Sequence, residues 1–300
     1  MAKRATRGKY HGFLVVEKPA GVTSHDVVGA VRRMTGERRV GHAGTLDPAA
    51  VGVLPIAVGL ATRTVEYLSE SDKGYLAEIT FGVTTDSLDG DGTVTEISDA
   101  SSLTREQVEG VLSNFRGNIL QVPPMHSAIK IEGRPLYERA RKGESIELDA
   151  RSVTIHKLEV VSWDHPVLEI YIHCSKGTYV RSLARDIGEA VKTGAYMSNL
   201  VRVSTGPFTL EDSWKLDELP TLIENGYWED IAGHPDVALY DRPAVVLGNE
   251  QALMWKNGSS VQLQVPAGLV RVYDVLGNWL GVGSGDPEIG MVKPEKVVTD

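Results

Sequence analysis

The first part of the chain alternates short apolar segments with polar turns. Apolar residues at 13–17 predict a strand, and the apolar segment 56–68 is expected to pack against the core. Between them, Thr23 and Asp26 have the spacing of a capping box, which predicts a helix that ends at Gly36. The expected buried face of this helix consists of Val27, Val28, Val31 and Met34.

The middle of the chain combines strands with helices. Strict alternation of apolar and polar positions predicts half-buried strands at 75–81 and 168–174. A second capped helix is expected to begin at Thr104. A third helix follows the turn at 175–178, and Gly194 is its expected end. Helices and strands are therefore interspersed along this part of the sequence.

The pattern changes near 236–243, where a domain boundary is expected. Beyond it the apolar runs are short, and Gly277 with Asn278 forms a two-residue hairpin signal. We therefore expect a large domain at 1–240 and a small β-rich domain at 241–300.

Composition narrows the class of protein. The 300 residues are 42% hydrophobic and 24% charged, as in ordinary globular proteins. No apolar run is long enough to span a bilayer, and the basic N-terminus lacks the apolar core of a secretion signal. The single Cys174 excludes an internal disulfide, fits a reducing cytoplasm, and is expected to be a buried structural thiol.

A metal centre is not expected. The eight histidines are scattered and show no zinc-ligand spacing. The acidic connector 86–93 faintly resembles a calcium loop but lacks the glutamate that the twelfth position requires. We therefore expect neither a metal nor another cofactor.

The net charge of -9 hides a strong asymmetry along the chain. Acidic residues dominate from Pro207 onward. The basic residues before position 64 are Lys3, Arg4, Arg7, Lys9, Lys18, Arg32, Arg33, Arg38, Arg39 and Arg63. The acidic residues in the same stretch are only Glu17, Asp26, Glu37 and Asp47. A solvated basic arm is the alternative for positions 3–9 taken alone, but the whole distribution favours a surface that binds nucleic-acid phosphates.

Asp47 is the one carboxylate in the segment 41–55, which reads GHAGTLDPAAVGVLP. Gly44 and Gly52 permit backbone shapes and close approaches that a side chain forbids, and Pro48 pushes Asp47 away from helical angles. The pattern predicts a rigidly held acid with room for a large substrate. An Asp-Pro pair taken alone is also a common start of a turn.

The segment 41–55 closely resembles the catalytic motif of the TruB family, the tRNA pseudouridine-55 synthases, which reads G-H-x-G-T-L-D-P-x-A-x-G-V-L. Two further segments match this family: 176–181 (KGTYVR) and 121–130 (QVPPMHSAIK). The resemblance implies an α+β pseudouridine-synthase fold, with a mixed, largely antiparallel sheet and flanking helices. It also implies a PUA-like RNA-binding domain at 241–300.

The resemblance implies that the protein isomerises uridine to pseudouridine at position 55, in the T loop of tRNAs. The enzyme would flip the base out of the folded hairpin, with Asp47 as the catalytic carboxylate. Arg181 would pair with Asp47, and Tyr75 would stack on the base and assist the final proton removal. Tyr179 would line the same pocket. On pattern alone, Tyr75 is a core tyrosine and Arg181 a surface residue.

Further RNA contacts are carried over from the family. The resemblance places His42 near the flipped base and Leu200 in the pocket. With the charge distribution, the residues expected at the RNA backbone are Lys18, Arg38, Arg39, Lys130 and Arg202. Lys18 also belongs to the segment 17–24, which matches the family's first motif, and there an architectural role is expected rather than a catalytic one. The chain departs from the family at His126, where Tyr or Phe is usual, and at Val201, where Arg is common. We expect the protein to act on tRNA as a monomer without an obligate protein partner.

Two other classes of function remain open. An N-glycosidase would cleave the nucleoside without rejoining it, but it needs a second carboxylate, and none is apparent beside Asp47 in the sequence. A non-catalytic tRNA-binding or tRNA-folding module would not need Asp47, Tyr75 and Arg181 together.

Overall fold

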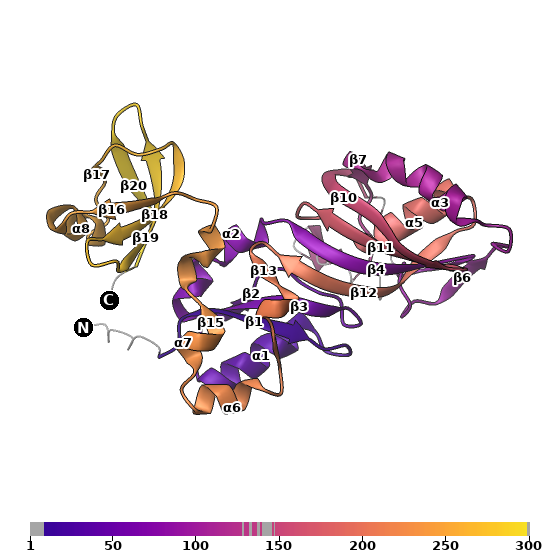
Figure 1. Ribbon diagram of the computed structural model, residues 1–300, viewed down its shortest axis with the longest axis horizontal. Helices are drawn as coiled ribbons and strands as arrows, with labels where there is room; N and C mark the ends of the chain where they lie inside the picture. The colour runs from indigo at the N-terminus through magenta and orange to yellow at the C-terminus, as the bar shows by residue number, and fades with distance from the viewer. Residues whose placement is uncertain are drawn as a thin grey trace.

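The computed structural model describes residues 9–127, 129–131, 134–136, 139, 146 and 148–298, so the basic positions Lys3, Arg4 and Arg7 lie outside the described residues. Among the described residues, the strands form one eleven-stranded sheet, one five-stranded sheet and two small ribbons. The large sheet is mixed, with helices packed on it, and the small sheet forms a separate module at the C-terminal end (Figure 1). The expected α+β class is confirmed.

Most neighbours in the large sheet are antiparallel, whereas the β1–β14 and β3–β12 pairs are parallel. The path through the sheet is β14 (Trp214–Lys215), β1 (Gly12–Lys18), β3 (Val51–Val58), β12 (Ala195–Thr205), β4 (Lys73–Phe81), β11 (Val167–Cys174), β10 (Arg151–Asp164) and β7 (Gly117–Gln121). Three short strands attach to it: β2 (Val40–His42), β13 (Phe208–Thr209) and β15 (Ala232–Gly233).

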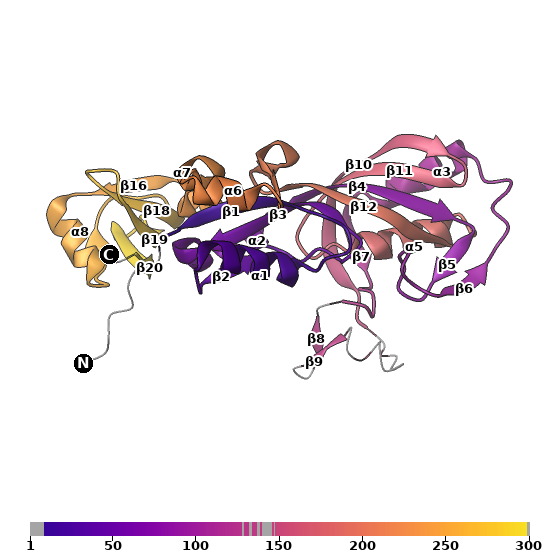
Figure 2. The ribbon, with the colours of Figure 1, turned by 90° about the horizontal axis from the view of Figure 1, so that it is seen from below.

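Helices and ribbons surround this sheet. Figure 2 shows α1 and the β8–β9 ribbon on the same side of it. The helices are α1 (Ser24–Thr35), η1 (Gly59–Arg63), α2 (Val65–Ser69), α3 (Arg105–Leu112), η2 (Ser113–Phe115), α5 (Val180–Ala190), η3 (Leu210–Asp212), α6 (Leu219–Glu224), α7 (Trp228–Ile231) and η4 (Pro235–Leu239). The ribbons are β5 (Val83–Thr85) with β6 (Val94–Ile97), and β8 (Lys130–Ile131) with β9 (Arg134–Pro135).

Residues 13–16 of strand β1 are all apolar because both of its faces are buried. Leu14 and Val16 join the main core, which the apolar faces of α1 and α5 also enter. Phe13 and Val15 point to the opposite face and join a smaller core with residues of η1, α2 and η4. Successive side chains of a strand point to opposite faces, so a continuous apolar run is the pattern of a strand that is covered on both sides.

The local capping signals in the sequence are confirmed. Thr23 and Asp26 form a complete capping box, and Gly36 closes α1 with a left-handed φ of 68°. Thr104 caps α3 in the same way. The third helix was expected to reach Gly194, but α5 already ends at Ala190 because the chain turns at 191–193.

The C-terminal module has its own apolar core around Trp255. Its sheet has the order β16–β18–β19–β20–β17, covered by α8 (Asn249–Lys256). The strands are β16 (Ala244–Leu247), β17 (Val261–Gln262), β18 (Gly268–Asp274), β19 (Trp279–Asp286) and β20 (Met291–Val297). The predicted hairpin joins β18 to β19, but its loop has four residues, 275–278, rather than two.

Candidate active site

A cavity of about 740 Å³ lies beside Asp47. Its walls come from three parts of the chain that are far apart in sequence: the segment 44–48, the acidic connector and the N-terminal end of α5. Tyr75 on β4 and Leu200 on β12 contribute from the sheet. The motif therefore lies at a large cavity.

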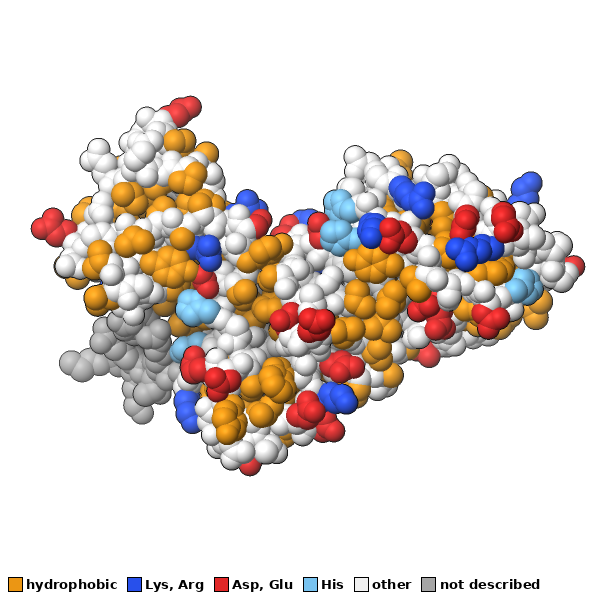
Figure 3. Space-filling model, in the orientation of Figure 1, with side chains coloured by type: hydrophobic (Ala, Val, Ile, Leu, Met, Phe, Trp, Pro, Cys, Tyr) orange, Lys and Arg blue, Asp and Glu red, His pale blue; other side chains and the backbone are white. Residues whose placement is uncertain are grey.

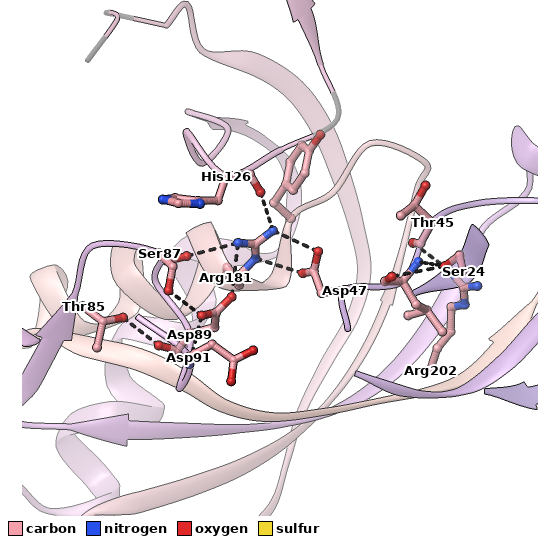
Figure 4. Close-up of polar contacts among 12 residues, drawn as sticks. Ser24, Thr45, Asp47, Thr85, Ser87, Asp89, Asp91, His126, Arg181 and Arg202 are labelled. Atoms are coloured by element: carbon pink, nitrogen blue, oxygen red, sulfur yellow. Dashed lines mark hydrogen bonds and ion pairs between the residues drawn. The ribbon is translucent and has the colours of Figure 1, made fainter. Parts of the chain in front are cut away.

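Arg181 and Asp47 form the ion pair that the sequence predicted. Nε of Arg181 lies 3.0 Å from Oδ2 of Asp47, and one terminal nitrogen lies 3.1 Å from Oδ1 (Figure 4). This two-point geometry fixes the orientation of the carboxylate as well as its charge. The Arg181 side chain is 5% exposed and that of Asp47 is 38% exposed, so the open side of the pair is the carboxylate.

The Arg181 guanidinium is saturated with acceptors. It donates to the carbonyl oxygens of Ser87 at 3.2 Å and His126 at 2.8 Å. It also pairs with Asp89 at 3.2 Å. Position 126, where the chain departs from the family pattern, thus contributes a backbone oxygen to this network. These contacts leave the guanidinium little freedom to move away from Asp47.

Asp89 is a site residue that the sequence did not reveal. It lies in the acidic connector, and its only sequence signal was a weak likeness to a calcium loop. In the structure it pairs with Arg181 (Figure 4). Within the part of the chain that the structure describes, no group of three His, Cys, Asp or Glu side chains could hold a metal ion. The connector therefore supplies a second carboxylate to the same guanidinium.

The pKa of Asp47 lies above its usual range. Burial is the main cause, Asp89 adds to it, and Arg181 and Lys18 act in the opposite direction. An ionised carboxylate that is held at a cavity and shielded from water is a stronger nucleophile than one in bulk solvent. Arg181 is therefore the group that keeps Asp47 ionised in these surroundings.

Lys18 is buried, which corrects its expected role at the RNA backbone. Its side chain is fully covered, and Nζ donates to the carbonyl oxygens of Pro19, Val22 and Pro48 at 2.7 to 3.0 Å. Burial lowers the pKa of Lys18 to about 8. Three acceptors require three N–H donors, so the ammonium form fits these contacts. Lys18 fixes the backbone after Asp47 and does not reach a phosphate.

Arg202 is also buried, and its expected role at the RNA backbone is wrong for the same reason. It is 1% exposed and donates to backbone carbonyl oxygens on both sides of Asp47 in the sequence. The backbone of Arg202 explains why position 52 is a glycine. A Cβ at this position would lie 2.3 Å from the Arg202 carbonyl oxygen. Strands β3 and β12 can approach this closely only because position 52 has no side chain.

Ser24 holds the residue before Asp47. Its hydroxyl accepts from the Leu46 amide at 2.9 Å and lies 3.2 Å from the Leu46 carbonyl oxygen, to which it donates. The segment around the carboxylate is thus anchored by Ser24, Lys18 and Arg202 through backbone groups. A backbone held in this way keeps the Asp47 side chain in one place when a substrate enters.

Both predicted tyrosines line the cavity. Tyr75 is buried on β4, and burial raises its pKa. Tyr179 precedes the first residue of α5, and its backbone exchanges two hydrogen bonds with the buried side chain of Gln121, at 2.8 and 3.0 Å. Leu200 is a buried lining residue on β12. The structure therefore brings Tyr75, Tyr179 and Leu200 together with Asp47.

The remaining predicted residues lie elsewhere. His42 is not among the cavity-lining residues: it lies on β2, with its ring 5.8 Å from that of His25, which does line the cavity. Arg38 and Arg39 are exposed beyond the end of α1. Lys130 belongs to β8, but its side chain lies outside the described part of the chain.

Among the described residues, no helix combines the length and the apolar character needed to cross a membrane.

The chain is similar to known proteins along nearly its whole length. Residues 32–180 match the TruB family pseudouridylate synthase N-terminal domain. Residues 181–235 match the tRNA pseudouridylate synthase B C-terminal domain, and residues 243–298 match a further C-terminal domain, that of pseudouridine synthase II TruB.

Curated relatives agree with these matches. The tRNA pseudouridine synthase B of Trichormus variabilis is 43% identical over 290 residues, which cover 95% of this chain and 98% of the relative. That of Carboxydothermus hydrogenoformans is 46% identical over 84% of this chain and 86% of the relative. The enzyme of Symbiobacterium thermophilum is 51% identical over 73% of this chain and 74% of the relative.

Solved structures share the fold. A structure of an H/ACA RNP bound to a substrate RNA containing 2'-deoxyuridine matches with a TM-score of 0.74 at 22% identity, and covers 100% of this chain and 92% of that chain. A Cbf5-Nop10-Gar1 complex matches with the same TM-score at 25% identity, and covers 99% of this chain and 91% of that chain.

Proposed function

Since the chain belongs to the TruB family of pseudouridylate synthases, and is accordingly a pseudouridine synthase, we propose that it converts uridine to pseudouridine at position 55 in the T loop of tRNA. The similarity to tRNA pseudouridine synthase B over 95% of the chain supports tRNA as the substrate. The observation that carries the chemistry is the two-point contact between Asp47 and Arg181 at an aromatic-lined cavity.

The reaction is an isomerisation of one nucleotide. The C1'–N1 bond breaks, the uracil turns, C1' bonds to C5, the proton on C5 leaves and N1 gains a proton. Nothing is oxidised or reduced overall. The protein must therefore supply an oriented carboxylate, a face on which the free base can rest, and a group that accepts one proton.

In our proposal, Asp47 is the catalytic carboxylate and Arg181 keeps it ionised and aimed at the nucleotide. The base stacks on Tyr75, because an aromatic face next to an unstacked base contributes about 1–3 kcal/mol. This gain offsets part of the few kcal/mol that unstacking a nucleotide costs. Tyr75 also lines this cavity, where it takes part in the final proton removal.

The tRNA body is expected to bind outside the cavity. Arg32, Arg33, Arg38 and Arg39 are exposed at and beyond the end of α1. The face in Figure 3 carries scattered acidic and basic side chains and no continuous basic surface. We propose that residues 1–240 carry the chemistry and that residues 241–300 grip the tRNA away from the T loop. The substrate and the single cysteine both fit a cytoplasmic enzyme.

A glycosidase that stops after bond cleavage is the second candidate, because Asp89 places another carboxylate on Arg181. The two oxygens of Asp89 already accept from Arg181 and from the Ser87 hydroxyl, which ties this carboxylate to the scaffold. We therefore favour isomerisation over hydrolysis.

One assay tests the proposed function and its rival. Purified protein is mixed with an unmodified tRNA transcript, pseudouridine is mapped by carbodiimide labelling and primer extension, and released uracil is measured by chromatography. We expect one pseudouridine, at position 55, and no free uracil. A transcript with cytidine at position 55 is the matched control. Modification of that control at another uridine, or stoichiometric uracil release, would refute the proposal.

A further inference from the structure

Arg202 lies at the centre of the sheet, between two strands that carry parts of the site. In the register of β4 and β12 it stands directly opposite Tyr75. In the register of β3 and β12 it stands opposite Gly52 of the Asp47 motif. Residues that face each other across paired strands project from the same face of the sheet. The fold therefore places Arg202 next to both the motif and the tyrosine.

The guanidinium of Arg202 spans the distance between these two parts. It donates to the carbonyl oxygens of Val53 at 2.7 Å and Gly44 at 3.1 Å. It also donates to that of Thr45 at 3.4 Å (Figure 4). Tyr75 projects from the same face of the sheet beside it, and the charge of Arg202 lowers the pKa of the Tyr75 hydroxyl. One side chain thus holds the backbone before and after Asp47 and lies beside the tyrosine of the cavity.

The burial of Arg202 is costly. It is 1% exposed, and none of the ion pairs found among the described residues involves it. Removing an ion from water is unfavourable even after the protein relaxes, and a neutral side chain of similar volume would avoid this cost. Backbone carbonyls alone would also accept from a neutral donor. The position beside Tyr75 gives the positive charge a role that packing does not.

We propose that Arg202 is a positioning residue for the reaction, which fixes the Asp47 segment and the Tyr75 hydroxyl relative to each other beneath the cavity. This inference rests on the proposed function of the cavity. Arg202 stands opposite Tyr75 across the paired strands, so its positive charge stabilises the phenolate when the Tyr75 proton leaves.

Other groups also face Tyr75. Cys174 on β11 and Asp47 raise the pKa of Tyr75 by their charge, after the larger effect of burial, whereas Arg202 lowers it. Lys73 lies two residues earlier on the same strand and is buried as well. If Arg202 acts through Tyr75, its removal must raise the pKa of Tyr75 while these other groups stay in place.

The test compares Arg202→Met and Arg202→Lys with Lys18→Met as the matched control. Lys18 is a second buried cation that holds the same segment, but it does not contact Tyr75. Three quantities are measured: the single-turnover rate on U55 tRNA, the dissociation constant for tRNA, and the titration of Tyr75. The titration uses the ¹³Cζ resonances of labelled tyrosine, assigned with Tyr75→Phe.

For Arg202→Met we expect a rate loss of about 100-fold, since misplacing reacting groups by ~1 Å costs that much. The dissociation constant should stay within a few-fold, and Tyr75 should titrate at higher pH than in the wild type. Arg202→Lys should recover part of the rate and of the shift, because it restores a charge. Lys18→Met should leave the Tyr75 titration unchanged.

The proposal is overturned if a folded Arg202→Met protein reacts at the wild-type rate, or if Lys18→Met changes rate and titration in the same way. If Arg202→Met does not fold, Arg202→Lys is judged by the same measurements. A Tyr75 titration that stays at the wild-type pH in a folded Arg202→Met protein also overturns it. Lack of pseudouridine formation by the wild type would refute the proposed function instead, and would leave the titration interpretable.

Discussion

The side chains of Asp47 and Arg181 come from segments 134 residues apart and meet through two contacts of 3.0 and 3.1 Å. The same guanidinium reaches a second carboxylate, that of Asp89, at 3.2 Å. One cation therefore stands between two acids in partly buried surroundings. This arrangement keeps Asp47 charged and oriented even though burial and Asp89 both raise its pKa.

Arg181→Met should lower the single-turnover rate by roughly two to four orders of magnitude. Removing one partner of a buried ion pair costs about 3–5 kcal/mol, because the other charge is left uncompensated. Arg181→Lys should lose less, since it keeps the charge but not the two-point geometry. Arg185→Met is the matched control on the same helix, because Arg185 pairs with Asp186 outside the cavity. Equal rates for Arg181→Met and Arg185→Met would give Asp47 some other partner.

The pH profile of Arg181→Met should move in a defined direction. Asp47 acts in its ionised form, so activity falls as the pH drops through its pKa. Arg181 is the largest influence that lowers this pKa, and its removal raises the pKa further. The acidic limb of kcat/KM should therefore shift to higher pH than in the wild type. A limb at unchanged pH would show that Asp47 does not control it.

Neutralising Arg32, Arg33, Arg38 and Arg39 together should weaken tRNA binding and flatten its salt dependence. These side chains are exposed, and each lost phosphate contact removes about 0.7–0.9 from the slope of log affinity against log salt. The rate on bound tRNA should change much less. Arg105→Gln is the control, since Arg105 is exposed on α3 and pairs with Glu109. An unchanged slope in the four-arginine variant would place the tRNA on another face.

Gly52→Ala should destabilise the protein more than Gly21→Ala. Both glycines have positive φ angles, of 104° and 82°, so both changes carry backbone strain of about 1–3 kcal/mol. A Cβ at Gly21 has nothing within 4 Å, whereas one at Gly52 meets the Arg202 carbonyl oxygen at 2.3 Å. Urea unfolding measures the difference. Equal losses of unfolding free energy in the two variants would mean that β3 and β12 can move apart at this point without cost.

The parts of this fold that depend on neighbours in sequence could be predicted. The capping boxes at Thr23 and Thr104 need only residues three positions apart. Strand β3 could not be predicted in this way, because it contains Pro55 and proline is rare in central strands. The Asp47–Arg181 pair was predicted because two family motifs each point to one of its members.

The scaffold of the site could not be predicted in the same way. Lys18 and Arg202 suggested surface contacts, because lysine and arginine are almost never fully buried. Their hydrogen-bond acceptors are backbone carbonyl groups of a folded segment. Every residue has such a group, so residue types do not show which ones will accept from a buried cation. Asp89 meets Arg181 across 92 residues, and its own neighbours suggested only an acidic turn. The ring of His42 lies 5.8 Å from that of His25, and its place beside the base stays a prediction.

The central claim is that Asp47 performs the isomerisation as a carboxylate, and Asp47→Asn tests it most directly. The change removes the charge with little change in volume, and Asp89 remains as a partner for Arg181. The account predicts no detectable pseudouridine at position 55 of tRNA, with tRNA affinity within about tenfold of the wild type, or ~1.4 kcal/mol. Turnover by Asp47→Asn within a few-fold of the wild-type rate would contradict the account.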